Sequence, residues 1–130
     1  MYTIGTAAKK TNMPIKTIRY YSDIGLVMPE GHSDKGYRLY DERALRRLIF
    51  VRRARAFGFS LKTCHNLLAL YSDQSRASAD VKAITINHIL EIDAKLSELQ
   101  TLRDELTLLA DSCAGDDRAD CPILSGLAAT

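Results

Sequence analysis

The longest regular pattern in the sequence is a stripe of large aliphatic residues within positions 80–111, a stretch that holds no glycine or proline. Some of these residues recur at intervals of seven and the others widen the stripe: Ile89, Ile92, Leu96, Leu99, Leu102 and Leu106. A heptad repeat of this kind is typical of a coiled-coil seam. We therefore expect one long helix over residues 80–111.

This helix would be about 45 Å long at a rise of 1.5 Å per residue, which is more than the short elements elsewhere in the chain can cover. Its apolar stripe needs a partner, and the simplest one is the same helix of a second copy in a two-fold dimer. A long helix packed within one monomer is the alternative. The pattern favours the homodimer.

Two shorter helical patterns open the chain and are separated by a break before Pro14. Thr3 is placed to cap the first, and Gly25 ends the second. The isoleucines of the second helix are expected on its buried side: Ile15, Ile18 and Ile24. Two short helices around a turn form the helix-turn-helix layout, whose second helix enters the major groove of DNA.

Residues 26–40 lose the helical period, are rich in turn residues and end in the alternating Tyr37-Arg38-Leu39-Tyr40. This pattern predicts a β-hairpin, or wing. Asp41 and Ser60 are placed to cap two further helices, which end near residues 57 and 71. Residues 1–71 are therefore predicted to form a winged helix-turn-helix head.

Charge is distributed unevenly along the chain. The net charge is +2, but residues 1–60 hold 12 Lys and Arg against 5 Asp and Glu, whereas residues 61–130 hold 6 against 11. A basic half suits a polyanion such as DNA, because lysines and arginines displace its condensed counterions. A solvated charged face is the alternative reading of the same imbalance.

The composition restricts the class of protein. With 130 residues, 46% of them hydrophobic and 26% charged, the chain is typical of a small globular protein. No apolar run approaches the roughly 20 residues of a membrane span, and the N-terminus lacks the apolar core of a secretory signal. We expect a cytoplasmic protein with no membrane partner. No carboxylate pair, Ser/His/Asp set or phosphate-binding glycine loop points to an enzyme.

Two of the three cysteines lie close together near the C-terminus. Cys113 is expected to follow the long helix, and Cys121 precedes Pro122, which suits the first turn of a short helix. The N–H groups and dipole of that helix would stabilise a Cys121 thiolate. Two sulfur ligands are too few for structural zinc, but they match a soft monovalent ion such as Cu(I).

Other uses of the cysteine pair stay open on spacing alone. The thiols could form a redox-switched disulfide, or they could be two unrelated buried cysteines. Two further hypotheses for function follow, a thiol-redox-sensing transcriptional activator and a cytosolic copper carrier. The copper carrier does not explain the basic charge of residues 1–60. Cys64 has no neighbouring thiol and is expected in the core.

Several short motifs stand out along the whole chain. Those of the first half are Ile4-Gly5, Ala7-Ala8, Thr17-Ile18-Arg19-Tyr20-Tyr21, Gly25-Leu26, Gly36-Tyr37-Arg38-Leu39-Tyr40 and Phe57-Gly58-Phe59-Ser60. Those of the second half are Ser78-Ala79-Asp80-Val81-Lys82 and the segment from Cys113 to Ile123. Together they resemble the MerR family of transcription regulators, and the second half is similar to its copper-responsive CueR/HmrR branch.

The resemblance implies a mainly α-helical fold in three segments. These are a winged helix-turn-helix DNA-binding head (1–71), a junction with an antiparallel coiled-coil dimerisation helix (72–111), and a metal-binding loop with a short C-terminal helix (112–130). It also implies one Cu(I), or Ag(I) or Au(I), per subunit on Cys113 and Cys121. Ser78 of the other subunit matches a cysteine of zinc-responsive relatives, so serine favours a monovalent ion.

The same resemblance implies a homodimer on a palindromic promoter operator, with RNA polymerase as a further partner. Metal binding would bend and underwind the promoter and so activate copper-efflux genes. The family's DNA contacts match Thr17, Arg19, Tyr20, Tyr37 and Arg38, and charge adds Lys16 and Arg55. Of the two adjacent tyrosines, we expect one ring in the core and Tyr20 on the DNA side.

Overall fold

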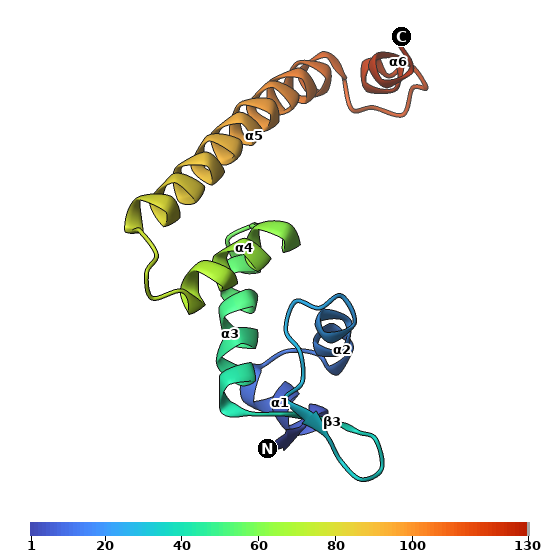
Figure 1. Cartoon of the computed structure of the whole chain (residues 1–130). Coiled ribbons are helices and arrows are strands. Elements are labelled where there is room, and N and C mark those ends of the chain that lie inside the picture. The colour runs from blue at the N-terminus through green and yellow to red at the C-terminus, as the bar shows by residue number, and fades with distance from the viewer. Residues whose placement is uncertain (130) are drawn as a thin grey trace. The chain divides into compact units, whose positions relative to one another are not determined.

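The computed structural model describes residues 1–129, and the fold is mainly helical (Figure 1). In chain order the elements are β1 (Tyr2–Thr3), α1 (Ile4–Thr11), α2 (Ile15–Asp23), β2 (Gly31–His32), β3 (Arg38–Tyr40), α3 (Glu42–Ala56), α4 (Leu61–Ser72), α5 (Ser78–Ser112) and α6 (Pro122–Ala128). The chain divides into two compact units, and the boundary between them falls between Val81 and Lys82. Thr130, the last residue of the predicted segment 112–130, lies outside the described residues.

Three helices of the N-terminal unit begin where the sequence places a capping side chain. Thr3, Asp41 and Ser60 each accept the backbone N–H of the residue three positions further on, at distances of 3.3, 2.8 and 3.1 Å. Such caps satisfy N–H groups that the first turn of a helix leaves unpaired. The predicted starts of α1, α3 and α4 are therefore confirmed.

The wing is part of a three-stranded antiparallel sheet in the order β1-β3-β2. β2 pairs with β3 with Gly31 opposite Leu39, which confirms the predicted hairpin. β1 pairs with the other edge of β3, with Tyr2 opposite Tyr40. The sequence pattern does not predict β1, because two residues are too few to show an alternation. This strand ties the N-terminus to the base of the wing.

The hydrophobic core of the N-terminal unit gathers side chains from its four helices, from β3 and from the segment after α2. Its largest fully buried members are Tyr40, Ile18, Leu48, Leu68, Val27, Val51 and Cys64. Burial raises the pKa of the Cys64 thiol, so this cysteine stays protonated at neutral pH. Its predicted place in the core is confirmed.

The buried side of α2 is narrower than the sequence pattern suggests. Ile18 is buried, but Ile15 and Ile24 are 41% and 45% exposed, so the prediction for these two residues is wrong. Ile15 stands at the very start of the helix, beyond the edge of the core. Ile24 follows Ile18 by six residues, which places it about 240° around the helix axis, away from the core.

α5 is one continuous helix of 35 residues, about 50 Å long. It begins two residues before and ends one residue after the predicted range of 80–111. None of its residues is buried. The exposed fraction lies between 41% and 62% for every residue of its aliphatic stripe: Ile89, Ile92, Leu96, Leu99, Leu102 and Leu106. A continuous apolar stripe open to water is typical of a surface that binds another protein chain.

Among residues 1–129, no helix combines the length and the apolar character that crossing a membrane requires.

Candidate metal centre and nucleic-acid interface

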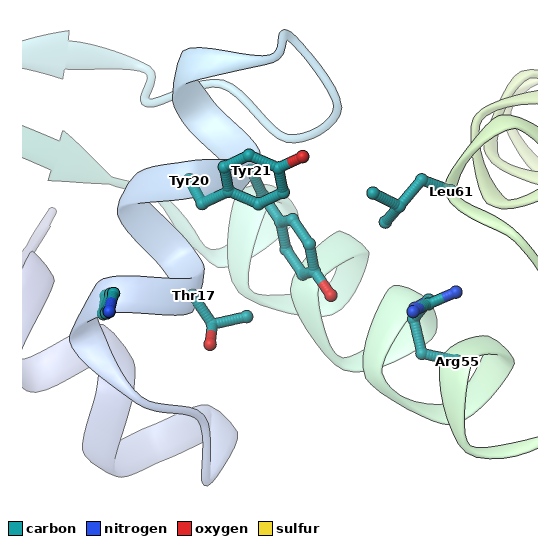
Figure 2. A pocket seen from close by; sticks show the side chains of 6 residues that line it. Thr17, Tyr20, Tyr21, Arg55 and Leu61 are labelled. Carbon is teal, nitrogen blue, oxygen red and sulfur yellow. The ribbon is translucent and has the colours of Figure 1, made fainter.

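A first cavity, of about 260 Å³, lies beside α2 between the end of α3 and the start of α4 (Figure 2). Its lining residues are Lys16, Thr17, Tyr20, Tyr21, Arg55 and Leu61. The two tyrosines differ as predicted, since Tyr21 is 7% exposed in the core and Tyr20 is 49% exposed. A hydroxyl, two phenols, an ammonium and a guanidinium group therefore line one opening beside α2.

The guanidinium group of Arg55 is anchored to the segment between α3 and α4. It donates a hydrogen bond of 2.7 Å to the carbonyl oxygen of Phe59. Burial raises the pKa of Tyr21, and Arg55 opposes that shift. A charged donor whose position is already fixed loses little side-chain entropy on binding an anion such as a phosphate.

A second cavity, of about 400 Å³, lies between α2 and the wing. Its lining residues are Thr3, Ile4, Arg19, Gly36, Tyr37 and Arg38. The seven residues predicted to contact DNA therefore all line one or the other of two cavities that share α2. Both cavities carry cationic side chains, which suits two successive contacts with a phosphate backbone.

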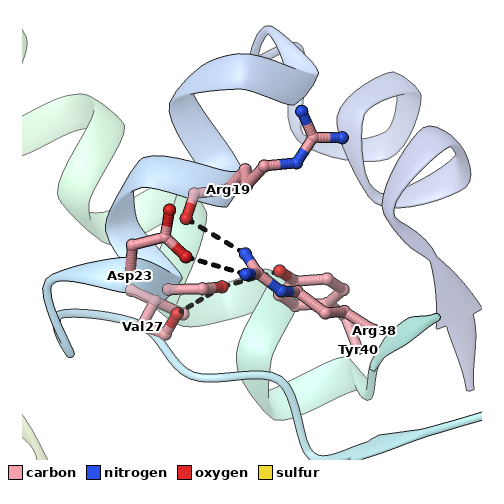
Figure 3. A network of polar contacts seen from close by, with 6 residues as sticks. Arg19, Asp23, Val27, Arg38 and Tyr40 are labelled. Carbon is pink, nitrogen blue, oxygen red and sulfur yellow. Dashed lines mark hydrogen bonds and ion pairs between the residues drawn. The ribbon is translucent and has the colours of Figure 1, made fainter. Parts of the chain in front are cut away.

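Arg38 has a second set of partners that sequence reasoning did not include (Figure 3). Its guanidinium forms an ion pair of 2.7 Å with Asp23 and donates a hydrogen bond of 3.2 Å to the carbonyl oxygen of Arg19. Both partners belong to α2, whereas Arg38 belongs to β3. No local pattern announces these contacts, because Asp23 and Arg38 are fifteen positions apart.

The two C-terminal cysteines lie at the two ends of the loop between α5 and α6. Cys113 follows the last residue of α5, and its N–H donates to the carbonyl oxygen of Ala110 at 3.1 Å. Gly115 then turns the chain with φ at +67°, a conformation that side chains other than glycine rarely adopt. Cys121 is the N-cap residue of α6 and Pro122 its first residue, as predicted.

The thiols of Cys113 and Cys121 lie near enough for one to affect the ionisation of the other. Both cysteines are free and only partly exposed. The pKa of the Cys121 thiol is lowered, chiefly by the backbone N–H of Leu124 and further by that of Ile123 and by Cys113, against partial burial and the charge of Asp120. The helix start thus favours the thiolate form, as predicted.

The donor set fits a thiophilic ion. It offers two adjacent sulfur atoms, one of them biased toward the thiolate that metals bind. Within residues 1–129 no group of three or more His, Cys, Asp or Glu side chains is arranged to hold a metal ion. Ser78 is the exposed first residue of α5, and its approach from a second subunit stays a prediction.

Between the cysteines, the loop carries its own ion pair. Arg118 binds Asp116 at 2.9 Å, and its backbone N–H donates to the same carboxylate at 3.0 Å. These bonds hold the pKa of Asp116 below its usual value. Arg118 therefore neutralises one of the acidic groups near the thiols. This weakens the electrostatic repulsion that would otherwise oppose thiolate formation.

α6 lies directly against the end of α5. A Cβ atom added at Gly126 would stand 2.6 Å from the Cδ2 atom of Leu109. Such a distance is far inside van der Waals contact, so the two helices approach closely because residue 126 has no side chain. The position of α6 on α5 and the position of Cys121 are thereby linked.

A winged helix-turn-helix head with cationic cavities along its recognition helix defines a DNA-binding regulator. The family profiles agree: "MerR HTH family regulatory protein" matches residues 2–70, and "MerR, DNA binding" matches residues 45–109. The chain belongs to the MerR family of helix-turn-helix regulatory proteins. This is a family of transcriptional regulators and not of enzymes.

Individual relatives match nearly the whole chain. It is 49% identical to the regulator HmrR of Rhizobium leguminosarum bv. viciae over 95% of both chains. It is 48% identical to the regulator CueR of Salmonella typhimurium, over 95% of this chain and 90% of that one. It is similar in structure to PbrR691 of Ralstonia metallidurans in complex with lead(II), with a TM-score of 0.85, 36% identity and coverage of 98% and 100%. The resemblance of the sequence to the MerR family and the predicted, mainly α-helical fold class are therefore confirmed.

Proposed function

We propose that this protein is a metal-responsive transcriptional activator that binds a palindromic promoter operator as a homodimer and responds to Cu(I), or to the related ions Ag(I) and Au(I). The observation that carries this proposal is the position of Cys113 and Cys121 at the two ends of the loop between α5 and α6, with the pKa of the Cys121 thiol lowered at the start of α6. The lead(II) complex of PbrR691 supports a metal ligand for this fold. Two sulfur ligands favour a monovalent ion over zinc.

In this proposal Cys113 and Cys121 hold one ion per subunit. Cys113 at the end of α5 and Cys121 at the start of α6 would hold this ion, which would supply metal–thiolate bonds there. The N–H of Leu124 lowers the pKa of the Cys121 thiol and so favours its thiolate form. The close approach of Gly126 to Leu109 lets α6 take one position on α5. The conformation in which both sulfurs can hold the ion would then gain population, because the ion binds this conformation more tightly than the alternative one.

The head supplies the readout of this shift. In a dimer formed through α5, two recognition helices contact the two half-sites of a palindrome, and the residues of both cavities bind the DNA backbone. A change in the position of one head relative to the other bends and underwinds the promoter, so that RNA polymerase engages it. Copper-efflux and detoxification genes are the proposed targets, and the cytoplasm is the proposed location.

Changing Arg19 to alanine is expected to weaken operator binding. Arg19 lines the cavity between α2 and the wing, and a side chain that neutralises one phosphate contributes about 0.9 to the slope of log affinity against log salt. We expect the slope to fall by about that amount. Titration of a labelled operator at four salt concentrations measures it, and an unchanged slope contradicts the assignment.

Changing Ser78 to cysteine is expected to extend the metal response toward divalent ions such as Zn(II). The variant adds a third thiolate, which a divalent ion requires more than Cu(I) does. Competition titration with a zinc chelator measures the affinity, with Ser75→Cys as a control on the same exposed junction. Equal zinc affinities for the Ser78→Cys variant and the unmodified protein would contradict the proposed position of Ser78.

The proximity of the two thiols also favours one other function, a redox sensor in which Cys113 and Cys121 form a disulfide. Anaerobic titration separates the two functions. If copper is the signal, Cu(I) activates transcription in vitro without any oxidant, and one equivalent per subunit suffices. Activation by an oxidant in the absence of metal would overturn the copper proposal.

A further inference from the structure

β3 is fastened to the C-terminal half of α2 by two of its three residues. Arg38 and Tyr40 are two positions apart, so their side chains leave the strand on the same face. Tyr40 is fully buried, and its hydroxyl is 2.7 Å from that of Ser22. Arg38 contacts Asp23 and the Arg19 carbonyl oxygen, and Figure 3 shows the Arg19 side chain leading away from this contact.

We call these contacts between β3 and α2 the brace. Its inner half is the Ser22–Tyr40 pair and its outer half is the Asp23–Arg38 pair, and the two halves differ in burial. The Ser22–Tyr40 hydrogen bond lies in the core, where the Ser22 hydroxyl also lies 3.3 Å from the Val27 carbonyl oxygen. The Asp23–Arg38 ion pair lies at the surface, with side chains 54% and 33% exposed. Only the outer half borders the cavity of Arg19, Tyr37 and Arg38. It is therefore the half that sets the position of the wing beside that cavity.

The negative charge of Asp23 is unexpected beside a cavity that is proposed to bind DNA. A carboxylate beside a DNA-binding cavity repels the phosphate backbone and by itself weakens binding. Yet its ion pair uses one amino group of Arg38 while the Arg19 carbonyl oxygen engages the other. A guanidinium held at two points keeps a defined orientation, because its donors form a rigid fork.

We propose that Asp23 is a positioning residue of the DNA interface, which strengthens operator binding by holding Arg38 and the wing in register with the recognition helix. The inference rests on the proposed DNA-binding function of the head. It predicts that removal of a negative charge at this place weakens binding to a polyanion, against the direction that charge alone dictates.

The test compares Asp23→Ala with Asp34→Ala in the full-length protein. Asp34 is an exposed residue of the wing that enters no ion pair within the described part of the chain. The probe is a labelled duplex selected from a random-sequence pool by the unmodified protein. Asp23→Ala is expected to weaken binding about threefold, the scale of an exposed ion pair, and Asp34→Ala to strengthen it. Unchanged or tighter binding of Asp23→Ala would overturn the proposal.

A second comparison separates positioning from a general loss of structure. In an Arg38→Gln background the Asp23–Arg38 ion pair is already absent, so Asp23→Ala is expected to strengthen binding as Asp34→Ala does. This reversal of sign is not expected of a variant that merely unfolds, and thermal unfolding of each variant checks that directly. Weaker binding in both backgrounds overturns the positioning role. If the unmodified protein selects no duplex at all, the proposed function fails, and the inference fails with it.

Discussion

Replacing Cys121 by serine is expected to reduce metal-induced transcription to the uninduced level while operator binding stays intact. Serine is itself a good N-cap residue, so α6 keeps its start. Its hydroxyl, however, does not ionise at neutral pH and is a poor ligand for a soft ion. The same loss is expected for Cys113→Ser, because each sulfur is half of the site.

Transcription from the operator-bearing promoter in vitro, with and without Cu(I), measures this loss. Cys64→Ala is the control, since it removes the third thiol from the core and leaves the loop unchanged. This control is expected to keep its induction. Induction that persists in either loop variant would contradict the two-sulfur site, whereas loss of operator binding would show that the loop also supports the head.

Replacing Leu99 by glutamate is expected to convert the proposed dimer into monomers and to weaken operator binding by at least about 100-fold. Leu99 is 62% exposed in the middle of the α5 stripe. A carboxylate placed in an apolar seam loses its hydration without gaining a partner. Two heads that are no longer linked each bind one half-site alone and lose the gain from effective concentration.

Light scattering behind size-exclusion chromatography, together with operator titration, measures both effects. Ser97→Glu is the matched control, because it adds the same charge two residues away at a polar position outside the stripe. The Leu99→Glu head is expected to remain folded, since the core consists of residues of the N-terminal unit. A dimer that survives Leu99→Glu would exclude α5 as the dimer interface.

Features that depend on neighbouring residues were predictable from the sequence. The caps at Thr3, Asp41 and Ser60 act over three residues. The heptad spacing of α5 and the Cys121-Pro122 start of α6 are equally local, and the structure has all of them in place. Local rules sufficed because each of these features satisfies backbone groups or places side chains within one or two helical turns.

Features that depend on distant contacts were missed or misjudged. The extent of the core decides that Ile15, at the start of α2, is exposed. The pairing of Tyr2 with Tyr40 and the brace between Asp23 and Arg38 join segments that only the folded chain brings together. The role of Ser78 depends on a second subunit and stays a prediction.

The central claim is that two thiolates hold one monovalent ion in each subunit. X-ray absorption spectroscopy at the copper edge tests it most directly, on protein loaded anaerobically with Cu(I) and assayed for metal and protein. The account predicts one copper per subunit with two sulfur neighbours and no nitrogen or oxygen ligand. A coordination shell rich in nitrogen or oxygen, or one with three or more sulfur atoms, would contradict it.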